Sequence, residues 1–159
     1  MPRIDRNAVP VMSGCRYPAS HDAPCQDREW LALGVAGGLA TLGVNLVTLA
    51  PGAWSSQRHW HAREDELVYV LEGELTRVEN DGESMLGPGD CAAFPAGVRN
   101  GHHLQNRTGE KAVFLAIGGR DGADWGEYSD IDMKFGEGRY SKDGVYLHKD
   151  GRPYGKKDG

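Results

Sequence analysis

Residues 52–73 read Gly52-Ala-Trp-Ser-Ser-Gln-Arg-His59-Trp-His61-Ala-Arg-Glu-Asp-Glu66-Leu-Val-Tyr-Val-Leu-Glu-Gly73. Successive side chains of a β-strand point to opposite faces, so His59 and His61 would share a face and the tryptophan between them would point away. Glu66 follows at the start of an apolar run. Two imidazoles beside a carboxylate are a common beginning of a divalent metal site. This segment therefore indicates a metal site on a β-sheet protein.

The composition is that of an ordinary globular chain with an excess of glycine. The 159 residues suit one domain with one core, and the 23 glycines favour short strands joined by tight turns. The formal net charge of −5 argues against a nucleic-acid partner. Apolar stretches are much shorter than the roughly 20 residues of a membrane span, and no secretory signal pattern is present, so we expect a cytoplasmic protein with no membrane partner.

The cysteine pattern does not indicate a disulfide framework. Cys15, Cys25 and Cys91 are an odd number without a C-x-x-C spacing. Cys91 lies in an apolar run and is predicted to be a small buried residue. A bond between Cys15 and Cys25 stays open as an alternative, although no secretory signal supports it.

Short apolar runs separated by turn residues fill the middle of the chain. Residues 80–82, Asn-Asp-Gly, form a hairpin signal because these residue types tolerate a positive φ. The run at 66–71 is continuously apolar, which predicts a strand buried on both faces. Strands at this spacing favour an antiparallel sandwich or barrel. The predicted strands are 42–49, 66–71, 74–79, 91–94, 102–106 and 111–117.

The two ends of the chain lack this pattern. We expect an irregular arm over residues 1–30, with an interface role and disorder as alternatives, and residues 31–38 are too rich in glycine to predict a helix. Later segments are predicted as a loop or short helix at 124–133, a last strand at 140–148 and a fraying end at 149–159. The expected organisation is one domain, with an N-terminal arm at 1–38, a core barrel at 39–120 and a C-terminal extension packing on it at 121–159.

Two segments resemble the paired motifs of the cupin superfamily. Residues 52–73 resemble the first motif, G-x5-H-x-H-x3,4-E-x6-G, with one extra residue before His59. Residues 89–106 resemble the second, G-x5-P-x-G-x2-H-x3-N, with four residues instead of two before His102. The 15 residues between the motifs are a spacing typical of small bacterial single-domain cupins with a type-2 conserved barrel. Further segments match one group of small cupins at 58–61, 101–106 and 149–154.

The resemblance implies an all-β fold, a cupin jelly-roll β-barrel that holds a metal ion inside. The family's ligands correspond here to His59, His61, Glu66 and His102, binding one divalent ion per chain. Such a set suits Zn, Fe, Mn, Ni, Co or Cu, and affinity alone does not choose among them. The fold is commonly dimeric, so we expect a homodimer.

Strand parity supports His102 over its neighbour. His102 and Asn106 are four residues apart and would share a face of an unbulged strand, whereas His103 would face away and serve packing. Asn106 is expected to hydrogen-bond the backbone. Glu64 and Asp65 are rival carboxylates, and we interpret them as exposed turn residues.

Several other side chains have a structural and a functional interpretation. Arg58 and Arg99 are expected to be solvated, with an anionic substrate at the mouth of the site as the alternative. The large aromatic side chains are expected to be core residues, or interface packing in the case of Trp60, with contact to a ligand as the alternative. These aromatic residues are Trp60, Tyr69 and Phe94.

The resemblance favours an enzyme that acts on a small oxygen-rich molecule. Isomerase, lyase and dioxygenase chemistry all occur in the family, and a metal ion with open positions would polarise a carbonyl or activate O₂. The alternatives are a ligand-binding or sensory module without catalysis and a structural or storage barrel stabilised by metal. No catalytic nucleophile or base can be assigned from the sequence.

Overall fold

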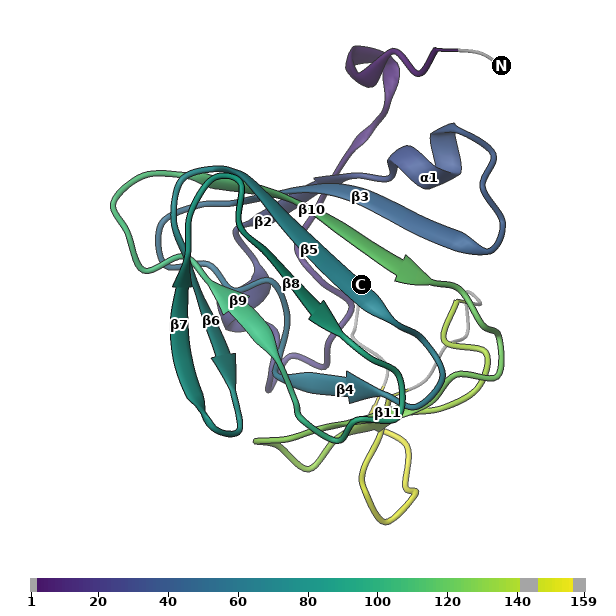
Figure 1. The fold of residues 1–159 in the computed structure, drawn as a ribbon. Coiled ribbons are helices and arrows are strands. Elements are labelled where there is room, and N and C mark those ends of the chain that lie inside the picture. The colour runs from purple at the N-terminus through teal and green to yellow at the C-terminus, as the bar shows by residue number, and fades with distance from the viewer. Residues whose placement is uncertain (1–2, 141–145, 156–159) are drawn as a thin grey trace.

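The computed structural model describes residues 3–140 and 146–155, and this part of the chain is built almost wholly of β-strands (Figure 1). Three short helical turns accompany them within the described residues: η1 (Arg6–Ala8), η2 (Ala23–Cys25) and α1 (Leu33–Ala36). The strands are β1 (Val11–Ser13), β2 (Arg28–Leu31), β3 (Leu42–Leu49), β4 (His59–His61), β5 (Glu66–Glu72), β6 (Leu75–Glu79), β7 (Gly82–Leu86), β8 (Cys91–Phe94), β9 (His103–Gln105), β10 (Ala112–Gly119), β11 (Gly126–Tyr128), β12 (Lys134–Phe135) and β13 (Tyr146–Leu147). The prediction of an all-β chain is confirmed.

The described strands form three antiparallel sheets around one main core. The largest sheet has the order β1-β2-β3-β10-β5-β8, and the smaller ones have the orders β7-β6-β9 and β13-β12-β11-β4. The core fills the space between the large sheet and the β7-β6-β9 sheet, where apolar side chains of both are buried. Phe114 of β10, Val70 of β5 and Leu104 of β9 meet there.

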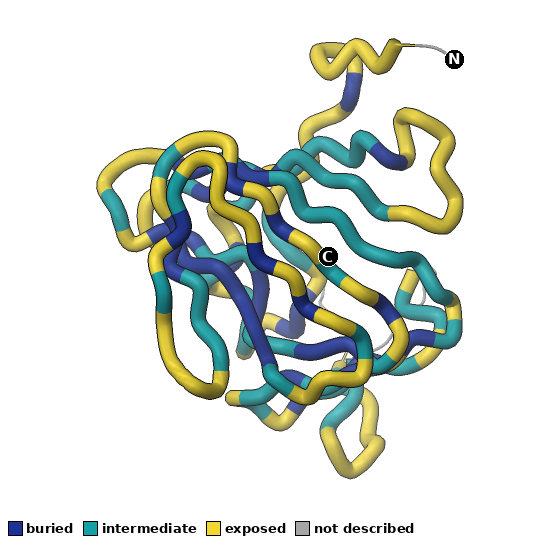
Figure 2. The backbone as a smooth tube through the Cα atoms, in the orientation of Figure 1, coloured by how far each residue is buried: buried dark blue, intermediate teal, exposed yellow. Residues whose placement is uncertain are grey.

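Burial alternates along β5, which corrects one prediction. Val68 and Val70 face the core, whereas Leu67, Tyr69 and Leu71 are 37%, 40% and 45% exposed. The continuous apolar run predicted a strand buried on both faces, and Tyr69 was expected in the core. Figure 2 shows the alternating buried and exposed segments of this sheet. The second face is apolar but uncovered in the single chain.

The predicted strand boundaries hold closely in the centre of the chain. Strands β3 and β8 span the predicted ranges, and β5, β6 and β10 differ from theirs by one or two residues at an end. The last motif strand is shorter than expected: β9 covers only His103–Gln105, and His102 forms an isolated bridge with His59. The alternation within β8 also leaves Cys91 exposed rather than buried, because Ala92 and Phe94 take the core face.

Both ends contain more regular structure than the sequence pattern suggested. β1 pairs with β2, and β2 pairs with β3 with Trp30 opposite Val47, so the N-terminal segment widens the large sheet. β11 pairs with β4 in a region expected to be a loop or short helix. Strand β13 falls inside the predicted last strand, but residues 141–145 of that prediction lie outside the described residues, as do residues 156–159.

Two glycines permit close approach of the backbone, one after β5 and one in β11 beside the histidine pair. At Gly73 φ is +76°, and a Cβ there would lie 2.6 Å from the carbonyl oxygen of Lys111. At Gly126 a Cβ would lie 2.0 Å from the carbonyl oxygen of Trp60, so only glycine lets β11 approach β4 this closely.

Two further expectations concern cysteines and membranes. Cys15 and Cys25 pack in the same apolar cluster, and the structure forms no disulfide between them. Within the described residues, the helices are too short and insufficiently apolar to cross a lipid bilayer.

Candidate metal centre

The histidine pair lies on β4, as the sequence pattern predicted. The rings of His59 and His61 are 4.9 Å apart between centroids, on the side of the strand that faces the barrel interior. Trp60 points the other way and packs edge-on against Trp125 at 5.2 Å. Pairing of β4 with β11 fixes this short strand, with His61 opposite Gly126.

Each imidazole of this pair is held through its Nδ1 atom. His59 Nδ1 donates to the carbonyl oxygen of Gln57 at 2.9 Å, and His61 Nδ1 donates to Asp124 Oδ2 at 2.6 Å. Because the Nδ1 atoms carry these protons, the Nε2 atoms keep their lone pairs. Both lone pairs are therefore available on the same side of β4.

Glu66 and His102 complete the cluster from two other strands. Glu66 opens β5, and its Oε2 lies 3.9 Å from His59 Nε2 and 3.5 Å from His61 Nε2. His102 Nε2 donates to the same Oε2 at 2.9 Å, and the ring of His102 stacks on Phe94 at 3.6 Å between centroids. The structure thus brings together all four residues predicted as ligands.

The donor set fits a divalent metal ion. Ligand atoms bound to one ion at about 2.0–2.2 Å lie roughly 3–4 Å from each other. The Nε2 atoms of His59, His61 and His102 lie 3.9, 3.5 and 2.9 Å from Glu66 Oε2. His59, His61 and Glu66 offer ligand atoms within 4.8 Å of one another, and His102 joins this group through Glu66. Among the described residues, His61 Nε2 is buried without a hydrogen-bond partner, which is costly unless another group occupies that side. An ion at the centre would replace the proton shared by His102 and Glu66. The chain could hold one ion through these four side chains.

The electrostatic environment favours the metal-binding protonation states. Burial lowers the pKa of His59 well below its usual value, and the neighbouring His61 lowers it further. Burial acts to raise the pKa of Glu66, but His61, the hydrogen bond from His102 and His59 outweigh it and the pKa falls far below 4.5. Neutral imidazole and ionised carboxylate are the forms that coordinate metal.

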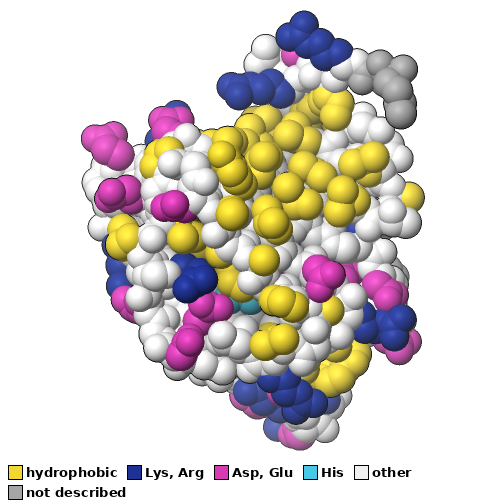
Figure 3. All heavy atoms as spheres, viewed as in Figure 1, with side chains coloured by type: hydrophobic (Ala, Val, Ile, Leu, Met, Phe, Trp, Pro, Cys, Tyr) yellow, Lys and Arg dark blue, Asp and Glu magenta, His cyan; other side chains and the backbone are white. Residues whose placement is uncertain are grey.

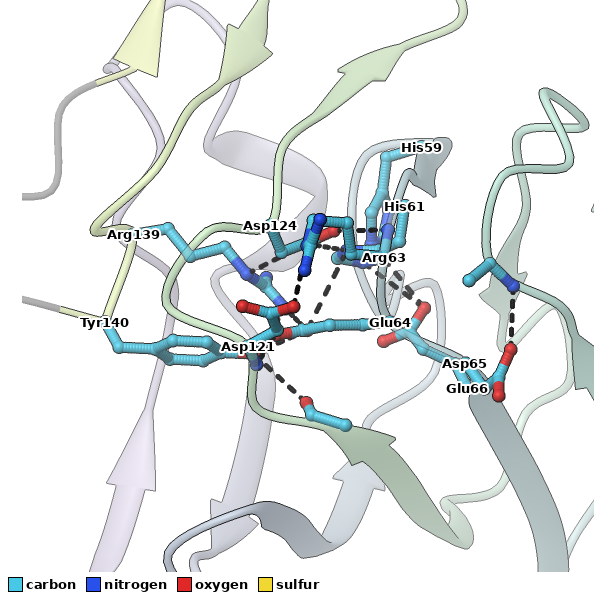
Figure 4. A network of polar contacts seen from close by, with 12 residues as sticks. His59, His61, Arg63, Glu64, Asp65, Glu66, Asp121, Asp124, Arg139 and Tyr140 are labelled. Atoms are coloured by element: carbon cyan, nitrogen blue, oxygen red, sulfur yellow. Dashed lines mark hydrogen bonds and ion pairs between the residues drawn. The ribbon is translucent and has the colours of Figure 1, made fainter.

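A second polar cluster lies behind His61 (Figure 4). Asp124 is fully buried, and its Oδ1 accepts from the backbone N–H of Arg63 at 2.9 Å. Arg139 Nε lies 3.5 Å from Asp124 Oδ2, and the Arg139 guanidinium also donates to Glu64. Figure 4 shows Asp124 between Arg139 and His61, while Glu66 approaches the imidazoles from the other side.

The position of Glu64 corrects a prediction. Glu64 was interpreted as an exposed turn residue, but it is only 2% exposed. Its carboxylate accepts from the Tyr140 hydroxyl at 2.6 and 2.7 Å and from the backbone N–H of Asp121 at 2.6 Å. Asp65 is exposed, as expected, and accepts from the backbone N–H of Ala96. The partners of Glu64 come from the C-terminal segment, so the sequence around residue 64 could not predict its burial.

The remaining candidates divide between core and surface roles. Arg58 is not simply solvated, because its guanidinium donates to both carboxylate oxygens of Asp130 and to Asn80. Arg99 is exposed, and its guanidinium lies 5.0 Å from the Trp60 ring. His103 is buried and donates to the carbonyl oxygen of Ser56, away from the cluster, as predicted.

Asn106 has the structural role that was expected of it. Its side-chain amide nitrogen donates to the carbonyl oxygens of Leu49 and Glu110, and its oxygen accepts from Thr108. The residue is fully buried. It therefore ties the end of β3 to the loop before β10.

A pocket opens beside the ligand cluster. It is lined by Trp60, His61, Glu79, Phe94, Asn100 and His102, among others. Its volume is about 60 Å³, so a ligand larger than a few atoms would extend from the ligand cluster to the surface. Figure 3 shows histidine atoms at the bottom of a hollow on the face viewed. The candidate metal centre is thus accessible from outside.

Comparison with known proteins places this architecture in a family. The cupin domain family matches residues 45–118. One similar crystal structure is that of a sugar phosphate isomerase from a cupin superfamily, and the protein comes from Silicibacter pomeroyi. Its sequence is 44% identical to this chain, the comparison covers 97% of each chain, and the TM-score is 0.90. A structure from Acidithiobacillus ferrooxidans is 32% identical, with 72% of each chain covered and a TM-score of 0.68.

A more distant neighbour shares the fold alone, and the curated proteins give no match. The polyketide cyclase RemF from Streptomyces resistomycificus is 23% identical, covering 76% of this chain and 80% of its own, with a TM-score of 0.62. Three observations indicate the same family: the paired motifs, the jelly-roll arrangement of strands and the similarity along nearly the whole chain. The chain belongs to the cupin superfamily, as a small protein with a β-barrel and a candidate divalent metal site.

Proposed function

We propose that this protein is a metal-dependent isomerase that interconverts aldose and ketose forms of a small sugar phosphate. The observation that carries the proposal is the convergence of His59, His61, Glu66 and His102 beside an open pocket. The 44% identity to a sugar phosphate isomerase over 97% of both chains supports this choice among cupin reactions. The two neighbouring oxygens of a hydroxycarbonyl compound suit an ion with two adjacent open positions.

The chemistry requires a polarised carbonyl and a fixed substrate. A divalent ion in this site would act as a Lewis acid on the carbonyl oxygen. The chain's own residues fix the ligand geometry: Asp124 orients His61, the Gln57 carbonyl orients His59, and Phe94 stacks on His102. Such support keeps the three imidazoles from rearranging when a ligand binds.

The test is turnover of a panel of aldose phosphates with three to six carbons. Wild-type protein is reconstituted separately with each candidate divalent ion, and aldose–ketose conversion is followed by NMR. The matched variant is His61→Ala, which removes one proposed ligand. Equal conversion by the two proteins, or none by any metal-loaded wild type, would reject the proposal. Binding without conversion would instead indicate a sensory module, and a rise in Tm on metal addition without ligand binding would indicate a structural role.

We also propose that the protein is a homodimer through the outer face of its large sheet. Apolar side chains gather on this face in Figure 3, and exposed ones include Val11 of β1 and Leu67, Tyr69 and Leu71 of β5. A twofold interface brings the same patch of both copies together, so an apolar patch is self-complementary. Light scattering after size exclusion should give twice the chain mass. Tyr69→Glu should produce monomer, whereas Glu83→Gln on β7 should not.

A further inference from the structure

The pocket beside the metal centre contains a carboxylate outside the ligand set. Glu79 ends β6 and lines this pocket together with His61 and His102. Its side chain is only 14% exposed, and a glutamate buried to this extent is usually paired with a cation or a hydrogen-bond donor. Among the described residues that line the pocket, the other side chains are proposed ligands or cannot accept a proton.

Strand parity explains why Glu79 faces the pocket. Leu75 is fully buried in the main core, and Glu79 lies four residues later on the same strand, so both point to the barrel interior. In the antiparallel register, Arg77 is opposite Leu104 and Val78 is opposite His103. Continuing that register places Glu79 across from His102. The Glu79 carboxylate therefore lies beside His102. It reaches this position from the β7-β6-β9 sheet, whereas β4 and β5 belong to the other two sheets.

Two neighbours hold the Glu79 carboxylate in place. Arg77 contacts Oε2 at 3.1 Å, and the side-chain amide of Asn100 donates to Oε1 at 3.2 Å. Asn100 is itself fixed, because its oxygen accepts from the backbone N–H of Asn80 at 2.8 Å. A carboxylate anchored in this way keeps its position when a substrate enters, as proton transfer requires.

The same interior face has polar groups that lack partners within the described chain. Arg77 Nε and Ser84 Oγ are buried without a hydrogen-bond partner among the described residues. Arg77 and Ser84 are directly opposite each other in the β6–β7 pairing. Buried polar atoms without partners are costly. Neither residue is among those that line the pocket, so a ligand there is placed to contact Glu79 rather than these two atoms.

We infer that Glu79 is the catalytic base that moves the proton in the proposed isomerisation, an inference that rests on that proposed function. Its carboxylate takes the proton from the carbon beside the carbonyl, and the electrons of that C–H bond form the C=C bond of an enediol while the carbonyl oxygen takes up a proton from water. The carboxyl group then returns its proton to the former carbonyl carbon. In this second half of the reaction the neighbouring hydroxyl releases one proton to water, which restores the balance, and becomes the new carbonyl, so no atoms or electrons are gained overall.

The test compares Glu79→Gln with Glu83→Gln in the metal-loaded protein. Glu83 is an exposed residue on the adjacent strand that pairs with Arg107, so it provides the same chemical change away from the pocket. Three quantities are measured: kcat and KM for the best aldose phosphate, exchange of the substrate's C2 hydrogen with solvent deuterium, and metal content. A reduced, non-isomerisable polyol phosphate is titrated calorimetrically as a binding probe.

Glu79→Gln should lower kcat by about 100-fold or more and abolish deuterium exchange, with metal content and binding of the polyol phosphate close to wild type. Glu79→Asp should retain part of the exchange, which separates chemistry from misfolding. Glu83→Gln should match wild type in all measurements. Wild-type kcat and exchange in Glu79→Gln would overturn the inference and leave the isomerase proposal standing. Loss of metal or of probe binding in both Glu79 variants would also overturn it, and an inactive wild type would reject both proposals.

Discussion

The two sides of the His61 imidazole differ in how completely their polar groups are satisfied. On the Nδ1 side, Asp124 accepts from His61 and is surrounded by donors from Arg63 and Arg139. On the Nε2 side, the described residues supply no hydrogen bond to His61 at all, and Glu66 approaches only to 3.5 Å. We call the Nδ1 side, where the polar groups have partners, the scaffold side, and the Nε2 side, where the donor atoms could hold a divalent ion, the ligand side. The His61 ring thus lies between a region of satisfied hydrogen bonds and the candidate metal site.

Removing His61 should have the largest effect, because it disrupts both sides. His61→Ala is expected to lower divalent metal affinity by more than about 100-fold, since a direct ligand contributes more than its supporting groups. Metal content after reconstitution and desalting measures this. The control is His148→Ala, which removes a partly exposed histidine that contacts Asp132. Full metal content in His61→Ala would mean that the ion is held elsewhere.

The scaffold side should matter most for folding stability. Arg139→Met leaves the buried carboxylates of Glu64 and Asp124 without their shared cation. The free energy of unfolding should fall by about 3 kcal/mol, near the lower end for a broken buried ion pair because the Arg139 side chain is partly exposed. Urea unfolding followed by circular dichroism measures it.

The control for this change is Arg107→Met, which breaks an exposed pair with Glu83. Surface pairs of this kind contribute less than about 1 kcal/mol. Equal losses in the two variants would mean that the cluster behind His61 is not a buried scaffold in solution, and the contrast between the two sides of the imidazole would disappear.

Asp124→Asn tests whether the scaffold side of His61 influences the metal affinity of the ligand side. Asparagine still accepts a hydrogen bond from His61 Nδ1 but lacks the negative charge that makes the imidazole a stronger donor to metal. Metal affinity should fall by about 10- to 100-fold, measured by competition with a chromophoric chelator. Asp150→Asn, an exposed site, should have no effect. Unchanged affinity in Asp124→Asn would show that the two sides act independently.

The sequence predicted the Nε2 side of His61, with the candidate ligands, better than the Nδ1 side. His59, His61 and Glu66 lie within eight residues, and the strand period alone places the two histidines on one face. His102 followed from its spacing to Asn106, although the strand there begins one residue later than expected. These candidate ligands lie in local motifs, so the resemblance to the two cupin motifs, together with strand parity, was sufficient to predict that they meet.

The scaffold side could not be predicted because its residues meet only through tertiary pairing. Asp124 lies 63 positions from His61, and it is brought there by the pairing of β11 with β4 in a segment that looked like a loop. Glu64 resembled a turn residue because nothing nearby in sequence identifies Tyr140 or Arg139 as its partners. Glu79 lay in a predicted strand, but its place beside His102 depends on the register of β6 with β9.

The pH dependence of stability should separate the two sides in protein stripped of metal. Burial lowers the pKa of His59, so this imidazole takes up a proton near pH 6.5 in the unfolded chain but stays neutral there in the folded chain. Stability is therefore lost as the pH falls below about 6.5, by up to about 1.4 kcal/mol per pH unit for this group. On the scaffold side, burial acts to raise the pKa of Asp124, but hydrogen bonds from His61 and Arg63 outweigh it and lower the pKa.

Asp124 consequently contributes stability above pH 3.8 and loses it only as the pH falls below that value. Burial also lowers the pKa of His103, which points away from the cluster, so thermal unfolding between pH 7 and pH 5 should report both imidazoles. His59→Gln should therefore reduce the slope in that window by the share that belongs to the ligand side. Asp124→Asn should leave this slope unchanged and alter the curve only at lower pH. A wild-type curve that is flat from pH 7 to pH 5 would mean that the buried imidazole of His59 is not kept neutral by folding. In that case the chain would not prepare the ligand face for metal in advance, and the ion itself would have to displace the protons.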